Sequence, residues 1–247
     1  STTAPPDPTL VELMDGAGMT ATARRMFLGA TPRVEDKATL AQSCAKLLSS
    51  SEPGTVHTYG CVVSGKVHLR EFDNPEMRDF RYVVAAHELL HLAYARLPAP
   101  DRARIDAELR AARTDNALLE ERLAIYSQDA NDTLNEVHAV IGTEFAGLSA
   151  ELEAHFSRYF DRGRVTDAYE RTLGGRLREI RRLKAVIAET EARLDALKPQ
   201  LDALRQTGPV RTYNALVDEY NAVVAEHNAA VQQGRALSAE YNELTGG

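Results

Sequence analysis

The chain has 247 residues, of which 44% are hydrophobic and 26% are charged, and its formal net charge is −7. This composition is ordinary for a soluble globular protein with one substantial core, and the lack of a basic cluster argues against nucleic acid as a partner. No run of about 18 apolar residues is present, so the sequence predicts no membrane-spanning helix.

The beginning of the chain, "STTAPPDP", is rich in proline. We expect residues 1–17 to form a leader or linker, of the kind that remains when a secretion signal or an anchor has been removed. A short helix is expected next over 19–32, where Thr20 can cap the first turn. A second helix is expected over 35–50, because apolar residues recur there at helical spacing.

The pattern then changes to the period of two that is typical of strands. It predicts a β-hairpin over 55–72, with Ser64-Gly65 as its two-residue turn. Cys61 in the first strand and Cys44 in the preceding helix are either small buried thiols of a cytosolic protein or one disulfide that ties helix to strand. The disulfide and the proline-rich beginning favour an extracytoplasmic location, secreted or anchored through a segment outside this sequence; a cytoplasmic location is the alternative.

From Arg78 onward the sequence predicts helices almost without interruption. They are expected over 78–97, 101–113, 115–127, 132–146 and 149–160.

The last third of the chain has a different periodicity. Beyond Ile180 the apolar residues recur at alternating steps of three and four, a pattern that residues 207–209 interrupt and that Tyr213 resumes. Two such stripes joined by a turn predict an antiparallel coiled-coil hairpin, with His227 in its seam. Pro199 should kink the first arm or mark a local irregularity in it.

The segment "HELLH", from His87 to His91, lies inside an otherwise apolar helix. Residues four apart on a helix project from the same face one turn apart, so both imidazoles can reach one ion. Glu88 lies beside them, close enough to contact a water on that ion without being a ligand. Buried without partners, these three side chains would cost several kcal/mol, and a divalent cation removes that cost.

This H-E-x-x-H arrangement resembles the zincin metallopeptidases. The glycine and histidine that metzincins place soon after the motif are missing, which narrows the resemblance to the gluzincins. In that branch the third zinc ligand is a glutamate on a later helix, often within Asn-Glu, and Asn135-Glu136 matches that pair. The resemblance therefore implies one Zn²⁺ ion held by His87, His91 and Glu136, with the fourth position left for water.

Two other residues of the same helix are alternatives for the third ligand. We rank Glu144 and then His138 after Glu136, and only one of the three can face the metal on a regular helix. Gluzincins commonly carry an aspartate four residues after the ligand glutamate, to orient a zinc histidine. Here that position is Val140, so the residues that orient the ligands must differ.

The resemblance also implies a mechanism in which Glu88 is the general base that activates water. The tetrahedral oxyanion needs donors besides the metal. His155 and Tyr159, one turn apart on a predicted helix, are candidates, as is Arg162 shortly after them.

These expectations describe an α+β protein that is mostly helical. A zincin-like metallopeptidase domain over 18–165, with a β-hairpin or short sheet packed on helices, would be followed by a coiled-coil hairpin over 166–247. The expected function is hydrolysis of peptide bonds in a peptide or protein substrate, with the coiled coil as a docking arm for a partner or substrate. One alternative is a catalytically inactive zincin-like scaffold that binds proteins through its coiled coil. Another is a metal hydrolase that acts on a cell-wall amide.

Overall fold

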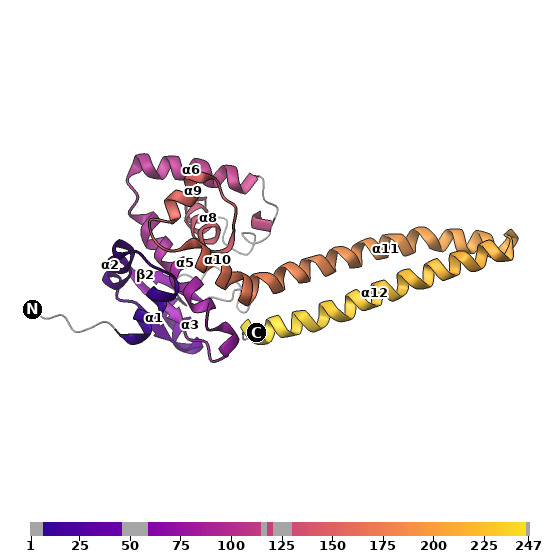
Figure 1. Ribbon diagram of the computed structural model, residues 1–247, viewed down its shortest axis with the longest axis horizontal. Coiled ribbons are helices and arrows are strands. Elements are labelled where there is room, and N and C mark those ends of the chain that lie inside the picture. Colours follow the sequence, from indigo (N-terminus) through magenta and orange to yellow (C-terminus); the bar gives the residue numbers. More distant parts are fainter. Residues whose placement is uncertain (1–6, 46–58, 115–117, 121–129, 246–247) are drawn as a thin grey trace, which may run out of the picture. The chain divides into compact units, whose positions relative to one another are not determined.

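The computed structural model describes residues 7–45, 59–114, 118–120 and 130–245 (Figure 1). The chain is mostly helical, at 78%, and includes a small three-stranded sheet, so the predicted α+β class with a majority of helix is confirmed. It divides into two compact units, Ser1–Thr172 and Leu173–Gly247. The boundary predicted at 165/166 falls inside a helix of the first unit.

The first unit begins with two capped helices. In α1 (Pro8–Gly16), Asp7 accepts a hydrogen bond from the Thr9 amide at 2.8 Å and proline occupies the first turn. Leu13 and Met14 of this helix are buried. The expected leader therefore does not extend to residue 17, because a proline that reads as a linker signal also suits the first turn of a helix. The helix α2 (Ala21–Gly29) is capped by Thr20, as predicted.

The sheet has the strand order β1-β3-β2. Its strands are β1 (Arg33–Glu35), β2 (Gly60–Val63) and β3 (Lys66–Arg70). β2 and β3 form the predicted antiparallel hairpin, and both residues of its turn, Ser64 and Gly65, have positive φ, as a type I′ turn requires. β1, which pairs with β3 in parallel, was not predicted, because a strand of three residues is too short to show an alternating pattern.

A disulfide joins Cys44 to Cys61. Cys44 is the C-cap of α3 (Lys37–Ser43), and Cys61 lies in β2. Both cysteines are buried and pack with Leu40. Of the two alternatives for this pair, the structure shows the one that ties helix to strand, which is compatible with an extracytoplasmic location.

Among the described residues, the other elements of the first unit are helices. Its elements are η1 (Pro75–Met77), α5 (Phe80–Ala95), α6 (Ala99–Thr114), α8 (Ala130–Glu144), α9 (Ala150–Phe156), α10 (Arg162–Tyr169) and η2 (Glu170–Gly174), the last of which runs into the second unit. The helix expected over 115–127 lies almost wholly outside the described residues, as does the end of the helix expected over 35–50.

Helix α5 is the centre of the first unit. It contacts α1, α2, α8 and α10 on its several sides and the strands β2 and β3 on another. Most of its side chains are buried, among them Leu89 and Leu90, while Arg81, His87 and His91 remain partly exposed. α8 approaches it closely at Gly142, where a Cβ atom would lie 2.4 Å from Leu90 Cδ1.

The second unit is a pair of antiparallel helices, α11 (Gly175–Thr207) and α12 (Val210–Thr245), which run side by side (Figure 1). Leu183 and Val223 are among the residues buried along the predicted stripes. His227 lies in the seam, with its Nδ1 atom 3.0 Å from Thr190 Oγ1. That hydroxyl already donates to a backbone carbonyl of its own helix, so the imidazole N–H donates to it. α11 remains helical through Pro199.

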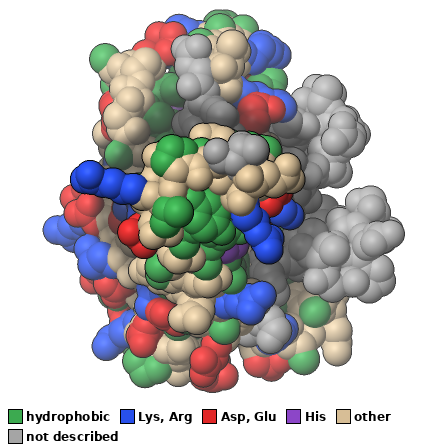
Figure 2. Space-filling view, turned by 90° about the vertical axis from the view of Figure 1, so that its right-hand side faces the viewer, with side chains coloured by type: hydrophobic (Ala, Val, Ile, Leu, Met, Phe, Trp, Pro, Cys, Tyr) green, Lys and Arg blue, Asp and Glu red, His purple; other side chains and the backbone are tan. Residues whose placement is uncertain are grey.

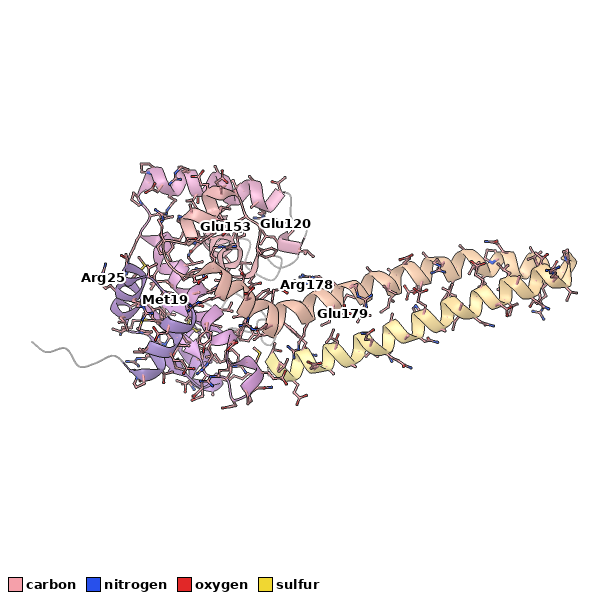
Figure 3. The ribbon with its side chains drawn as sticks, in the orientation of Figure 1. Met19, Arg25, Glu120, Glu153, Arg178 and Glu179 are labelled. Carbon is pink, nitrogen blue, oxygen red and sulfur yellow. A yellow bond between two sulfur atoms is a disulfide. The ribbon has the colours of Figure 1, made fainter. Side chains whose placement is uncertain are left out.

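Charged side chains line both helices of this pair (Figure 3). Arg193 of α11 pairs with Glu226 of α12 at 3.1 Å, and within α11 Arg182 pairs with Glu179 at 2.7 Å. Figure 2 shows acidic and basic side chains interspersed over the visible face of the molecule. Within the described ranges, no helix combines the length and apolar character needed to cross a membrane.

The disulfide should contribute measurably to stability. Replacing Cys44 and Cys61 together by alanine is expected to lower the free energy of unfolding by about 3 kcal/mol, because the unfolded chain gains the entropy that the cross-link removes. Urea unfolding with and without reductant measures this. Reductant should destabilise the native protein similarly and leave the double variant unchanged; a native protein insensitive to reductant under unfolding conditions would contradict the cross-link.

Candidate metal centre

Two histidines of α5 lie on one side of this central helix. His87 and His91 have ring centroids 4.9 Å apart, and their side chains are 17% exposed. The spacing of one turn predicted from the sequence therefore places both imidazoles together. Because they are partly exposed, an ion or a small molecule has a route to them.

A glutamate from a distant part of the chain faces this pair. Glu136 of α8 places Oε1 3.4 Å from His87 Nε2 and Oε2 3.5 Å from His91 Nε2. One ligand atom from each of the three residues lies within 4.8 Å of the others. Among the described residues, this is the one group of three histidine, cysteine or acidic side chains arranged to hold a metal ion.

The donor set fits a divalent metal. Two imidazole nitrogens and one carboxylate oxygen are ligands of zinc and of several other first-row transition metals. A bound cation would balance the charge of the Glu136 carboxylate. The cluster of His87, His91 and Glu136 can therefore hold a metal ion.

The residue before the glutamate orients one of the histidines. Asn135 Oδ1 lies 3.1 Å from His91 Nδ1. An amide oxygen can only accept, so His91 carries its proton on Nδ1, which leaves the lone pair of Nε2 directed toward Glu136. Asn135 thus orients a histidine of the motif. The sequence predicted no residue for this role, because Val140 stands where gluzincins commonly carry an aspartate.

The two alternative ligands on α8 lie elsewhere. His138 is fully buried, and its Nε2 atom is 2.8 Å from His155 Nε2. Glu144 is the last residue of the helix, two turns beyond Glu136. The structure therefore brings Glu136 to the histidine pair and neither of the other two.

Glu88 is buried between α5 and the sheet. Its side chain is 3% exposed, and Oε2 has no hydrogen-bond partner among the described residues. Burial raises the pKa of this carboxyl to about 7, an effect that nearby His91 opposes and Glu136 reinforces. A carboxyl with such a pKa can both take and release a proton near neutral pH.

His155 and Tyr159 form a separate buried cluster with His138. Both ring nitrogens of His155 have partners, because Nδ1 accepts from the Arg158 guanidinium and Nε2 faces His138. Tyr159 packs edge-on against the His155 ring, at 5.5 Å between centroids. Burial and the adjacent Arg158 charge lower the pKa of His155 to about 4, so this imidazole is neutral at pH 7. The oxyanion role expected for these two residues stays a prediction.

The tautomers of this cluster follow from its partners. Arg158 can only donate, so neutral His155 carries its proton on Nε2 and donates it to His138 Nε2. His138 then has its own proton on Nδ1, an atom without a hydrogen-bond partner in the described part of the chain. Burial lowers the pKa of His138 well below its ordinary value.

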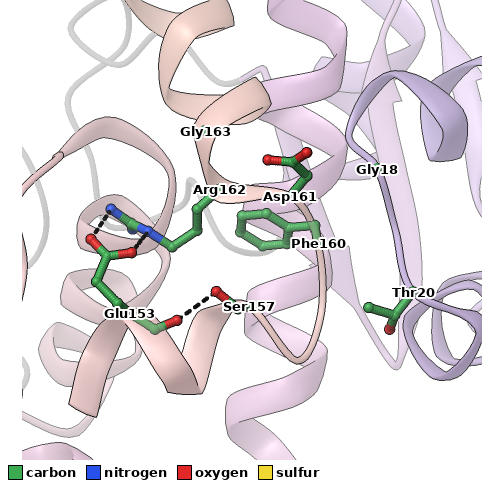
Figure 4. Close-up of a pocket in the computed structure, with 8 residues that line it drawn as sticks. All are labelled: Gly18, Thr20, Glu153, Ser157, Phe160, Asp161, Arg162 and Gly163. Carbon is green, nitrogen blue, oxygen red and sulfur yellow. Dashed lines mark hydrogen bonds and ion pairs between the residues drawn. The ribbon is translucent and has the colours of Figure 1, made fainter. Parts of the chain in front are cut away.

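Arg162 has a structural role that the sequence did not indicate. Its guanidinium donates to the carbonyls of Ile141 and Gly142, near the end of α8, and pairs with Glu153 at 2.7 Å (Figure 4). These bonds satisfy carbonyls that a helix leaves unpaired at its C-terminus and tie α8 to α9. Nothing in the local sequence signals the contact with α8, because Ile141 and Gly142 lie 21 and 20 positions before Arg162.

No protein-family model matches the chain, and neither a curated protein nor a solved structure matches it.

Asn135 provides a test of the metal centre. Replacing it by alanine should weaken Zn²⁺ binding by about 10- to 100-fold, because His91 loses the acceptor that holds its ring and tautomer. Competition with a chromophoric chelator measures the affinity. Glu144→Gln, on the same helix, is the matched control and should bind like the native protein; equal affinities for all three would rule out the orienting role.

The buried state of His155 predicts a pH dependence of stability. Its pKa is about 4 in the folded protein and near 6.5 when exposed, so the unfolded chain binds the extra proton between these values. Stability is therefore lost as pH falls from 6.5 toward 4, by about 2 kcal/mol at pH 5 from this group. In metal-free protein, urea unfolding at pH 7 and pH 5 should show a smaller loss for His155→Gln than for the native chain. An identical loss in both would contradict the burial of a neutral imidazole.

Proposed function

We propose that this protein is a zinc-dependent peptidase of the H-E-x-x-H type, similar to the gluzincins, which hydrolyses peptide bonds in a peptide or protein substrate. One observation carries the proposal: Glu136, 45 positions from His91 in the sequence, lies within 3.5 Å of both histidines of the motif. A chance H-E-x-x-H match in a packed helix would not require a distant carboxylate at that place.

The residues fit zinc in number and kind. Three protein ligands, His87, His91 and Glu136, leave a coordination position open, as catalytic zinc sites do and structural ones do not. When bound, such an ion supplies Lewis-acid chemistry that polarises a carbonyl and acidifies water. The orientation of His91 by Asn135 supports the same assignment.

Glu88 would act as the general base. Its carboxylate would take a proton from the attacking water and, once the carbon–nitrogen bond breaks, deliver that proton to the leaving amine. In the metal-free protein burial raises the pKa of Glu88 to about 7, and the positive charge of a bound zinc ion would lower this pKa toward the ionised carboxylate that a base requires. His155 is a poorer candidate for a direct role, since its two ring nitrogens are already engaged.

The strand β2 would hold the substrate. In the described part of the chain it pairs with β3 alone, and it contacts α5. The bond from the Arg70 amide to the Tyr59 carbonyl, at 2.8 Å, sets the register. Gly60 and Val62 then occupy non-hydrogen-bonded positions whose backbone N–H and C=O groups point away from β3. An extended peptide could add to this edge with little sequence selectivity.

The second unit would recruit a partner protein. α11 and α12 bury only part of their apolar stripes against each other; Ile187, for example, remains partly exposed. Because disulfides such as Cys44–Cys61 persist in oxidising compartments, we propose that the protein acts outside the cytoplasm, either secreted or anchored to a membrane.

One observation favours the alternative of an inactive zincin-like scaffold. The side chain of Glu88 is almost entirely buried, whereas a general base must reach its substrate water. In that case the protein would act through its helical pair, and partner capture would survive the loss of metal in His87→Ala.

The variant Glu88→Gln distinguishes the active peptidase from the inactive scaffold. If Glu88 is the general base, this variant should keep close to one zinc per chain by elemental analysis and lose at least about 10²-fold in the rate of cleavage, since glutamine cannot accept the proton. Cleavage is measured on a broad peptide library by mass spectrometry.

The matched control is Glu71→Gln, an exposed site on the segment after β3, which should cleave like the native protein. His87→Ala should lose both zinc and cleavage. Undiminished cleavage by Glu88→Gln rules the mechanism out, and a native, zinc-loaded chain that cleaves nothing favours the scaffold.

A further inference from the structure

The first residue of β2 lies directly against Glu88. A Cβ atom built on Gly60 would lie 2.7 Å from Glu88 Oε1, 2.9 Å from its Cγ and 3.0 Å from its Cδ. These are the three nearest heavy atoms, and all belong to one side chain. Carbon atoms do not approach a side chain so closely, so any residue other than glycine at position 60 requires Glu88 to move.

The contact with Glu88 explains why position 60 is a glycine, whereas the backbone conformation there does not require one. Gly65, in the hairpin turn, has φ +74°, a conformation that disfavours other residues. Gly60 is in a strand and does not have positive φ. Its only structural demand is space, and Glu88 occupies that space.

The strand cannot easily retreat from the contact. The neighbour of Gly60 on one side is Cys61, which the disulfide holds to Cys44. On the other side, the Tyr59 carbonyl accepts from the Arg70 amide at 2.8 Å. A side chain added at position 60 would therefore displace Glu88 before it displaced β2.

We propose that Gly60 is a positioning residue: by having no side chain, it lets β2 pack on Glu88 and sets the place of the carboxylate beside the metal centre. The catalytic consequence rests on the proposed function of Glu88 as general base. One oxygen of this carboxylate, Oε2, has no hydrogen-bond partner among the described residues, so packing is the main restraint on it. The three nearest atoms include none of His87, His91 or Glu136, so metal binding should not depend on Gly60.

Gly60→Ala in the full, zinc-loaded chain tests this. We expect the zinc content to be unchanged, kcat on a cleaved peptide to fall by about 10²-fold, and KM to stay within about twofold, because the base is misplaced while substrate binding is not. Gly29→Ala is the matched control, since a Cβ at that exposed helix end meets nothing within 4 Å, and it should not change kcat. Loss of zinc in Gly60→Ala, or a native kcat, would overturn the proposal.

A shorter acid should relieve the clash. In a Glu88→Asp background, Gly60→Ala should reduce kcat by a much smaller factor than in the native background, because aspartate leaves room for the added methyl group. A general weakening of the fold would instead lower kcat by the same factor in both backgrounds, and that result would sink the proposal.

A measurement without substrate separates this proposal from the proposed function. In metal-free protein, Gly60→Ala should lower Tm by several degrees, but by less than about 1 °C when Glu88 is already alanine. Equal shifts in the two backgrounds would show that the contact does not exist. If Gly60→Ala alone does not fold, recovery of folding in the double variant supports the contact and failure to recover excludes it. If the native chain cleaves no peptide, the proposed peptidase function is wrong. The difference between the two Tm shifts still tests whether Gly60 positions Glu88.

Discussion

The structure of the first unit depends on the burial of α5, a helix whose side chains are mostly apolar and yet include His87, Glu88 and His91. Burying the apolar side chains requires neighbours on every side, which α8, α10 and the sheet supply. Burying His87, Glu88 and His91 in such surroundings costs free energy unless they acquire partners. The close approach of α8 at Gly142 brings those partners, Glu136 and Asn135, to the histidines.

The buried polar groups around this helix form two clusters of different character. In the cluster of His138 and His155, packing holds two imidazoles neutral and each ring relies on hydrogen bonds to its neighbours. At the candidate metal centre, a bound cation would balance the charge of the Glu136 carboxylate, which comes from a distant part of the chain. The two clusters share α8, and Arg162 holds the C-terminal carbonyls of that helix in place. The position of Glu136 therefore depends on residues that have no chemical role themselves.

The sheet contributes to the same site through one strand. β2 is tied to α3 by the disulfide, and it packs on Glu88 at the position where it has no side chain. The proximity of Glu136 to both histidines carries the proposed hydrolysis of peptide bonds, and the position of β2 beside Glu88 is compatible with an extended substrate. The near-complete burial of Glu88 is equally compatible with an inactive scaffold.

The sequence by itself determined the local features, because their causes lie within one or two turns of chain. These are the capped α2, the Ser64-Gly65 hairpin, the pairing of His87 with His91 on one helical face, and the two stripes that become α11 and α12. Only the tertiary structure decided between Glu136, Glu144 and His138, paired Cys44 with Cys61, and revealed β1. It also engaged His155 with His138 and placed Gly60 on Glu88. Each of these depends on contacts between residues far apart in the chain, which local periodicity and propensity do not encode.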